Sequence, residues 1–248
     1  MINQVIEVAK EASKEIMKIY HSEDFNIKSK DDNSPVTIAD LKANEIIIDG
    51  LKKISSYPIV TEETPVKYHI RKNWKQFWLV DPLDGTKDFI AKNGEFTINI
   101  ALIENNKPIL GVVYIPVNDD IYYASKDKGA YKNGKKIYNN SSRKDLIGSD
   151  SNFHSTQATK DFFEKYKIKN IKRFGSSIKI CKLAEGEIDI YPRFNGTKEW
   201  DTAAIHIIAN EAGCKLIDIE TNKELVYNKE NIKNNFFIAS RNNLEYKK

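Results

Sequence analysis

Two aspartates lie close together in the segment 81–86 (DPLDGT), directly after the apolar run 77–80 (FWLV). The apolar run predicts a short buried strand that stops at Asp81, because Pro82 fixes one backbone torsion and turns the chain. Such a turn brings the carboxylates of Asp81 and Asp84 to one side, where they repel each other unless a cation lies between them. Ligand sets made only of oxygen favour a hard ion such as Mg²⁺.

The end of the same segment has the features of an anion-binding loop. Gly85 allows the backbone to approach a ligand closely, and a helix that starts at Thr86 would direct free N–H groups at an anion. Metal-binding carboxylates beside such a loop point to phosphate chemistry. A plain turn followed by a helix cap explains the same spacing equally well, so these residues alone leave both interpretations open.

Further acidic residues stand at the ends of expected elements. Glu62 and Glu63 follow a strand-like run at 57–60. Asp40 lies at the start of an expected helix, and Asp201 opens another. Taken singly, each has a simpler explanation as a helix-terminal charge or a solvated turn residue. Together with the two aspartates above they supply five acidic groups from four segments, which is what a two-metal site needs.

Hydrophobic periodicity and turn residues predict the elements that must position these groups. Expected helices cover 2–20, 37–54, 161–166, 177–185 and 202–212, and expected strands cover 77–80, 96–103, 109–115, 121–124, 146–147, 188–191, 215–219 and 236–239. A turn cluster is expected at 31–35. The pattern indicates an α+β first sub-domain at 1–140, which carries most of the acidic residues, and an α/β second sub-domain at 141–248, which completes the site.

The segment 129–136 (GAYKNGKK) fits most of a P-loop pattern, but Lys136 stands where a Ser or Thr would bind Mg²⁺. Asn133 and Gly134 between extended residues instead favour a hairpin turn. His206 lies on an apolar helix, where packing is the expected role.

Composition excludes several classes of protein. The 248 residues are 40% hydrophobic and 30% charged, which is typical of a globular chain. The 39 Lys and Arg against 35 Asp and Glu give a net charge of +4, and the lysines are scattered among acids, so no nucleic-acid partner is expected.

Cys181 and Cys214 indicate core thiols in a reducing compartment. No signal peptide or integral membrane span is expected. A cytoplasmic location follows, with peripheral attachment at the inner membrane face as a variant.

Four separated segments resemble the inositol monophosphatase superfamily, and within it the CysQ type of 3′(2′),5′-bisphosphate nucleotidase. They are SPVTxAD at 34–40, TEE at 61–63, WLVDPLDGTKDF at 78–89 and EWDTAA at 199–204. The resemblance also takes in 93–97, 107–114, 175–177 and 191–194, and so covers nearly the whole chain. It implies a layered α/β/α/β/α sandwich of two sub-domains with the site between them.

The resemblance also implies the catalytic apparatus. The metal ligands would be Glu62, Asp81, the backbone carbonyl of Leu83, Asp84 and Asp201, holding two or three Mg²⁺ ions. Asp40 and Thr86, together with Glu62, would position and activate the attacking water, and the backbone of Gly85 and Thr86 would cradle phosphate. No covalent phosphoenzyme is expected, and Li⁺ inhibition is a trait of the family.

The same resemblance implies the residues that bind substrate. They are Gly85, Thr86, Lys87, His154, Ser176, Ser177, Lys179, Arg193 and Asp201. The guanidinium group of Arg193 matches phosphate geometry, although exposed surface charges would explain Lys179 and Arg193 as well. One departure concerns Asn152, which stands where the CysQ type usually has Arg in Ser-Arg-Ser-His. This change leaves the exact nucleotide preference open.

The expected activity is Mg²⁺-dependent hydrolysis of the 3′-phosphate of adenosine 3′,5′-bisphosphate (PAP) to AMP and phosphate, with adenosine 3′-phosphate 5′-phosphosulfate as a second substrate. Its role would be to clear a by-product of sulfate assimilation. The alternatives are an inositol or sugar phosphatase of the same superfamily and, ranked lower, a non-catalytic nucleotide sensor. The expected assembly is a monomer or a homodimer.

Overall fold

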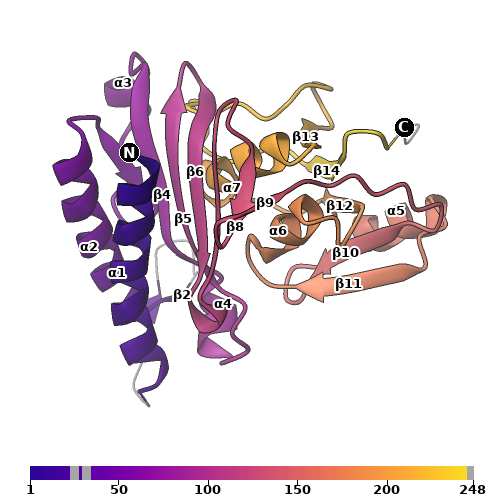
Figure 1. The fold of residues 1–248 in the computed structure, drawn as a ribbon, viewed down its shortest axis with the longest axis horizontal. Coiled ribbons are helices and arrows are strands. Elements are labelled where there is room, and N and C mark those ends of the chain that lie inside the picture. Colours follow the sequence, from indigo (N-terminus) through magenta and orange to yellow (C-terminus); the bar gives the residue numbers. More distant parts are fainter. Residues whose placement is uncertain (23–27, 30–34, 245–248) are drawn as a thin grey trace.

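The computed structural model describes residues 1–22, 28–29 and 35–244. The turn expected at 31–35 lies outside these residues except for Pro35, which pairs in the short antiparallel ladder of β1 (Lys28–Ser29) and β2 (Pro35–Val36). Two larger β-sheets and their helices build the rest of the molecule (Figure 1).

Two antiparallel helices, α1 (Ile2–Tyr20) and α2 (Ile38–Ile54), cover one face of the first sheet (Figure 1). Both confirm the helices expected from the sequence. The apolar residues of α1 recur at helical spacing and are buried against the sheet, while Glu and Lys pairs occupy the exposed side. Helix α2 begins after Thr37, whose hydroxyl oxygen accepts a hydrogen bond from the N–H of Ala39.

The first sheet has seven strands in the order β3-β4-β5-β6-β7-β8-β9, and only the β3–β4 pair is parallel. The strands are β3 (Ile59–Thr61), β4 (Gln76–Asp84), β5 (Thr97–Glu104), β6 (Lys107–Ile115), β7 (Asp120–Ser125), β8 (Ala130–Lys132) and β9 (Lys135–Ile137). Helix α3 (Tyr68–Arg71), helix α4 (Thr86–Ile90) and the 3₁₀ turn Pro116–Asn118 lie in its connections.

The expectation that β4 stops at Asp81 is wrong. Asp81 pairs with Asn99 and, after a shift in register, Asp84 pairs with Thr97. Pro82 lies in the resulting bulge, where its missing N–H breaks no ladder bond. The hairpin expected at Asn133 and Gly134 is confirmed: both residues have positive φ, at 48° and 79°, and they join β8 to β9.

The second sheet has five strands in the order β11-β10-β12-β14-β13, of which β10, β11 and β12 are parallel to one another. They are β10 (Ile147–Ser151), β11 (Asn170–Phe174), β12 (Ile190–Arg193), β13 (Cys214–Asp218) and β14 (Phe237–Arg241). The edge strand β11 was not expected, because its sequence NIKRF lacks a run of buried apolar residues. Helix α5 (Gln157–Lys165) begins earlier than expected, since the Thr156 side chain caps it.

Helices α6 (Ile178–Ala184) and α7 (Glu199–Glu211) lie between the two sheets, and α5 covers the outer face of the second (Figure 1). The expected α/β/α/β/α layering is thus confirmed. Helix α7 packs so closely on β6 that a Cβ placed on Gly111 would lie 2.3 Å from the carbonyl oxygen of Ala204. Because α7 belongs to the second half of the chain but packs on the first sheet, the sub-domain boundary at 140 stays a prediction.

Within the described ranges, no helix is both long and apolar enough to cross a membrane. Cys181 and Cys214 are buried free thiols, as expected. His206 is also buried, and its Nδ1 lies 2.9 Å from the hydroxyl of Tyr227, in keeping with a packing role.

Candidate active site

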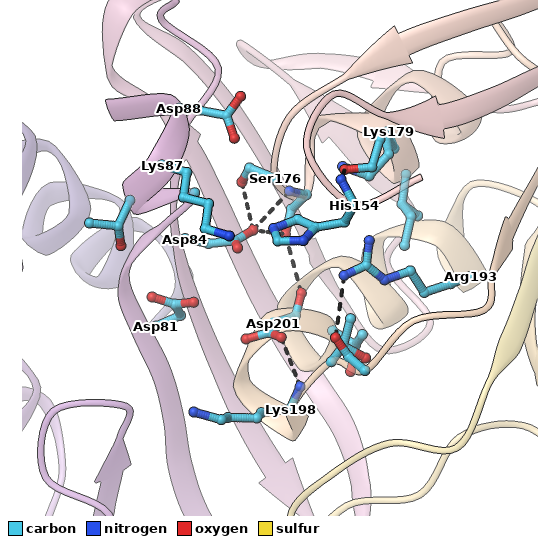
Figure 2. Close-up of a pocket in the computed structure, with 18 of the residues that line it drawn as sticks. Asp81, Asp84, Lys87, Asp88, His154, Ser176, Lys179, Arg193, Lys198 and Asp201 are labelled. Carbon is cyan, nitrogen blue, oxygen red and sulfur yellow. Dashed lines mark hydrogen bonds between the residues drawn. The ribbon is translucent and has the colours of Figure 1, made fainter. Parts of the chain in front are cut away.

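Three carboxylates from different elements converge in one place. Glu62 follows β3, Asp81 lies within β4, and Asp201 lies in the first turn of α7. One oxygen from each of them lies within 4.8 Å of the others. They line a cavity of about 470 Å³ that opens between the two sheets and α7 (Figure 2).

Local structure explains how these carboxylates are brought together. Strand β3 runs parallel to β4, and the N–H of Glu62 donates to the carbonyl of Val80, which places Glu62 beside Asp81. The carboxylate of Asp81 accepts a hydrogen bond from the N–H of Leu83 at 3.0 Å, across the bulge at Pro82. Asp201 accepts one from the N–H of Lys198 at 2.8 Å, so it also caps α7. Helix α7 begins at Glu199, earlier than expected, and Asp201 is therefore inside it.

Burial and like charge act together on this cluster. Desolvation, followed by repulsion from Glu62 and Asp84, raises the pKa of Asp81 well above its ordinary value. The same causes raise the pKa of Asp201. A divalent cation would remove both penalties, and the donors are all oxygen, so the residues present fit Mg²⁺ or a similar hard ion.

Asp84 lines the same cavity but is held differently. Its Oδ2 accepts hydrogen bonds from the hydroxyl of Ser176 at 2.6 Å and from the N–H of Ser177 at 2.9 Å (Figure 2). The Ser177 hydroxyl adds a third at 3.1 Å. The sequence placed both serines against the nucleotide and did not anticipate this role, because the residues are more than ninety positions apart. The bonds tie the end of β4 to the start of α6.

Asp40 and Thr86 meet beside the cluster. The Thr86 hydroxyl donates to Oδ1 of Asp40 at 3.2 Å. Oδ2 of Asp40 accepts from both the N–H and the hydroxyl of Thr37, at 2.8 Å and 2.6 Å. Asp40 is therefore a helix-capping residue and a partner of Thr86 at once, so the two interpretations drawn from the sequence are compatible.

The expected helix start at Thr86 is confirmed by α4, which follows Gly85. Gly85 has a φ of 92°, a left-handed value that glycine adopts without strain. Leu83, Gly85, Thr86 and Lys87 all line the cavity. The segment thus brings carboxylates and a tight backbone turn into one wall.

The opposite wall is basic (Figure 2). Lys179 is only 4% exposed, and its Nζ donates to the carbonyl of Phe174 at 3.1 Å. Burial, with a smaller effect of Arg193, lowers the pKa of Lys179 to about 8. Arg193 donates to the hydroxyl of Tyr191 at 3.3 Å and to the carbonyl of Asn195 at 3.2 Å. Lys179 is therefore not an exposed surface charge, while Arg193 is half-buried and lines the cavity.

His154, Ser176 and Ser177, which the resemblance places among the substrate-binding residues, also line the cavity. Burial, followed by repulsion from Arg193, lowers the pKa of His154 to about 4, so its ring is neutral near pH 7. Asn152, the departure noted above, donates to the carboxylate of Glu95 and lies 3.5 Å from Oδ1 of Asp88.

Several lining residues were missed by sequence reasoning. They are Asp88, Ser151, Ile180, Tyr191, Gly196, Thr197, Lys198, Thr202, Lys233 and Phe237. Asp88 and Tyr191 lie inside segments that carried the resemblance, which was an available signal. Lys233 reaches the cavity through an isolated bridge to Lys198, which no local pattern reveals.

Known proteins share this architecture. The model of the Inositol monophosphatase family matches residues 1–245. The 3′(2′),5′-bisphosphate nucleotidase CysQ of Escherichia coli K12 is 43% identical over 224 residues, which is 88% of this chain and 90% of that protein. The protein of the same name from Buchnera aphidicola is 46% identical over 222 residues, or 87% and 83% of the two chains.

Solved structures agree. The crystal structure of CysQ from Bacteroides thetaiotaomicron, described as a bacterial member of the inositol monophosphatase family, has a TM-score of 0.88 and 39% identity, covering 98% of this chain and 97% of that one. An inositol monophosphatase from Thermotoga maritima has a TM-score of 0.80 and 27% identity, covering 96% and 90%. The carboxylate cluster, the fold and these matches together show that the chain belongs to the inositol monophosphatase family of metal-dependent phosphatases.

Proposed function

We propose that this chain is a 3′(2′),5′-bisphosphate nucleotidase that converts PAP to AMP and phosphate, with adenosine 3′-phosphate 5′-phosphosulfate as a second substrate. The relatives named CysQ support this activity. The observation that carries it is one cavity with a carboxylate cluster on one wall and the cations of Lys179 and Arg193 on the other. That arrangement suits a substrate with one reacting and one anchoring phosphate.

In this proposal Glu62, Asp81, the carbonyl of Leu83, Asp84 and Asp201 hold two or three Mg²⁺ ions. When bound, Mg²⁺ lowers the pKa of water and offsets negative charge on phosphate oxygens. The hydrogen bonds from Ser176 and Ser177 hold Asp84 in one orientation. The bond from Lys198 does the same for Asp201.

Asp40 and Thr86 manage the proton of the attacking water. The Thr86 hydroxyl oxygen accepts that proton while the hydroxyl proton passes to Oδ1 of Asp40, along the 3.2 Å hydrogen bond. Thr37 occupies Oδ2, which leaves Oδ1 directed at Thr86. Glu62, beside Asp81, completes the group that orients the water.

The second phosphate binds the basic wall. Arg193 offers a planar guanidinium and Lys179 a buried ammonium, both suited to phosphate oxygens. Neutral His154 contributes hydrogen bonds rather than charge. The backbone of Gly85 and Thr86, together with Lys87, contacts the reacting phosphate.

Phosphate release tests this proposal. We expect PAP to be hydrolysed with Mg²⁺ and to have a kcat/KM at least about ten-fold above those of inositol 1-phosphate and fructose 1,6-bisphosphate. Asp84→Asn should abolish turnover, while Asp145→Asn, at an exposed aspartate, serves as the matched control. An inactive parent, or equal activity in Asp84→Asn, contradicts the proposal. A preference for inositol 1-phosphate would favour the inositol phosphatase, and tight PAP binding without turnover would favour a sensor.

Three further expectations belong to this proposal and have their own measurements. Inhibition by Li⁺ is read from the same assay. Light scattering of the purified chain distinguishes a monomer from a homodimer. Cell fractionation tests the cytoplasmic location against attachment at the inner membrane face.

A further inference from the structure

A buried carboxylate that is not among the cavity-lining residues stands two positions before Asp201. Glu199 is 1% exposed, and its two oxygens accept hydrogen bonds from the N–H groups of Asn228 and Lys229 at 2.8 Å and 2.9 Å. The Nζ of Lys229 adds an ion pair at 2.8 Å. The start of α7 is thereby attached to a loop nearly thirty residues further along the chain.

Further hydrogen bonds attach that loop to the first turn of α7. The N–H of Glu199 donates to the carbonyl of Ile232 at 2.9 Å. The side-chain amide of Asn234 donates to the carbonyl of Lys198 at 2.9 Å and to the hydroxyl of Thr202 at 3.0 Å. Because Asp201 lies within this turn, its position follows that of the loop.

The same loop is joined to the segment that carries Glu62. Arg71 is 3% exposed and donates to Oδ1 of Asn228 at 2.8 Å and to the carbonyl of Lys229 at 2.7 Å. The Nε of Arg71 also donates to the carbonyl of Val66 at 3.1 Å, which links α3 to the stretch between Glu62 and α3. The Asn228 side chain returns a bond to the carbonyl of Arg71 at 3.0 Å.

We propose that Arg71, Asn228 and Glu199 form a positioning network that holds Glu62 and Asp201 at the spacing a divalent cation requires, and so sets the affinity of the cluster for metal. The inference rests on the proposed metal-dependent function. Carboxylates whose oxygens lie within 4.8 Å repel each other before a cation binds, so the chain must supply the stiffness that keeps them together. A buried charge adds little net stability over a packed apolar group, but it imposes directional geometry.

Direct binding of Mn²⁺, a spectroscopic probe for the Mg²⁺ site, tests this inference without using activity. Glu199→Gln keeps the shape of the side chain but removes its negative charge. The amide NH₂ would then face donors, namely the backbone N–H groups of Asn228 and Lys229 and the Lys229 ammonium. Asn228→Gly removes both bonds to Arg71, and because Asn228 has a φ of 66°, glycine adopts its backbone without strain. We expect Glu199→Gln to raise the Kd for Mn²⁺, measured by electron paramagnetic resonance, about ten-fold or more. Asn228→Gly should produce a smaller rise.

Asp189→Asn is the matched control. Asp189 is a fully buried carboxylate just before β12; it accepts a backbone N–H from Ile147 of β10 at 2.9 Å and pairs with Arg241 of β14 at 3.1 Å. The Asp189→Asn variant should lower the Tm while leaving the Mn²⁺ affinity of the folded protein unchanged. Parent-like Mn²⁺ affinity in both network variants would overturn the inference, as would equal weakening in Asp189→Asn. A parent that binds no Mn²⁺ contradicts the proposed function itself, a failure visible before any variant is made.

Discussion

The hydroxyl of Thr86 lies 3.2 Å from Oδ1 of Asp40, although the residues belong to helices 46 positions apart in the chain. Thr86 lines the cavity, whereas Asp40 is buried and has its other oxygen held by Thr37. In the proposed mechanism, a carboxylate fixed in this way would accept a proton through the hydroxyl rather than directly from the cavity.

Removing the hydroxyl should therefore impair the chemical step more than binding. We expect Thr86→Ala to lower kcat for PAP by about 10²–10⁴-fold, the usual contribution of general-base catalysis, with little change in KM. Thr86→Ser retains the hydroxyl and should recover most of kcat. Steady-state kinetics at saturating Mg²⁺ decide the matter, and a full rate in Thr86→Ala would remove Thr86 from the proton path.

The carboxylate cluster should destabilise the metal-free protein in a pH-dependent way. The pKa of Asp81 is raised in the folded chain, so the folded state binds this proton more tightly than the unfolded state does. The stability gained from the proton is complete below the unfolded pKa, about 4, and is lost as the pH rises toward the folded pKa. Relative to Asp81→Asn, the parent in EDTA should therefore lose stability above about pH 4.

At pH 7.5 we expect metal-free Asp81→Asn to melt a few degrees above the parent, since about 1 kcal/mol shifts Tm by about 2–4 °C at this chain length. Mg²⁺ should reverse the order, because ligand at a hundred times its Kd stabilises the parent by about 2.7 kcal/mol. Differential scanning calorimetry from pH 4 to 8, with EDTA or Mg²⁺, measures both. A Tm difference that does not vary with pH would contradict this account.

Lys179 should impose an alkaline limit on substrate binding. Its pKa of about 8 means that the ammonium loses its proton just above neutral pH. We expect kcat/KM for PAP to fall above pH 8, mainly through KM, because a neutral amine no longer attracts the anchoring phosphate. Lys179→Met should lower kcat/KM by about 10–100-fold at pH 7 and remove the decrease above pH 8. Lys179→Arg should shift this decrease to higher pH, since guanidinium stays charged. A pH profile identical in all three proteins would exclude Lys179 as the group that titrates.

Gly111 allows β6 and α7 to approach each other. A Cβ there would meet the Ala204 carbonyl oxygen at 2.3 Å and Cγ2 of Ile207 at 2.6 Å. We expect Gly111→Ala to lower the free energy of unfolding by about 1–3 kcal/mol, because α7 must move outward. Urea denaturation measures the loss. Gly134→Ala, at a turn with open space around it but positive φ, isolates the cost of backbone strain alone.

Much of this protein was determined by residues close together in the chain. The periodicity of 2–20 and 37–54 predicted α1 and α2, and Asn133 with Gly134 predicted the β8–β9 hairpin. The segment 81–86 indicated paired carboxylates and a tight turn. These predictions succeed because helix faces, turns and caps depend on neighbours within a few positions.

Other features were decided only by tertiary structure. The passage of β4 through Pro82 needed β5 to accommodate a bulge, and β11 exists because β10 offered an edge to a segment with no strand-like pattern. The bonds from Ser177 to Asp84, and the chain from Arg71 through Asn228 to Glu199, join residues that local sequence does not relate. Such contacts arise when two sheets close around α6 and α7, since packing of distant apolar faces, rather than any local preference, determines which polar groups are buried together.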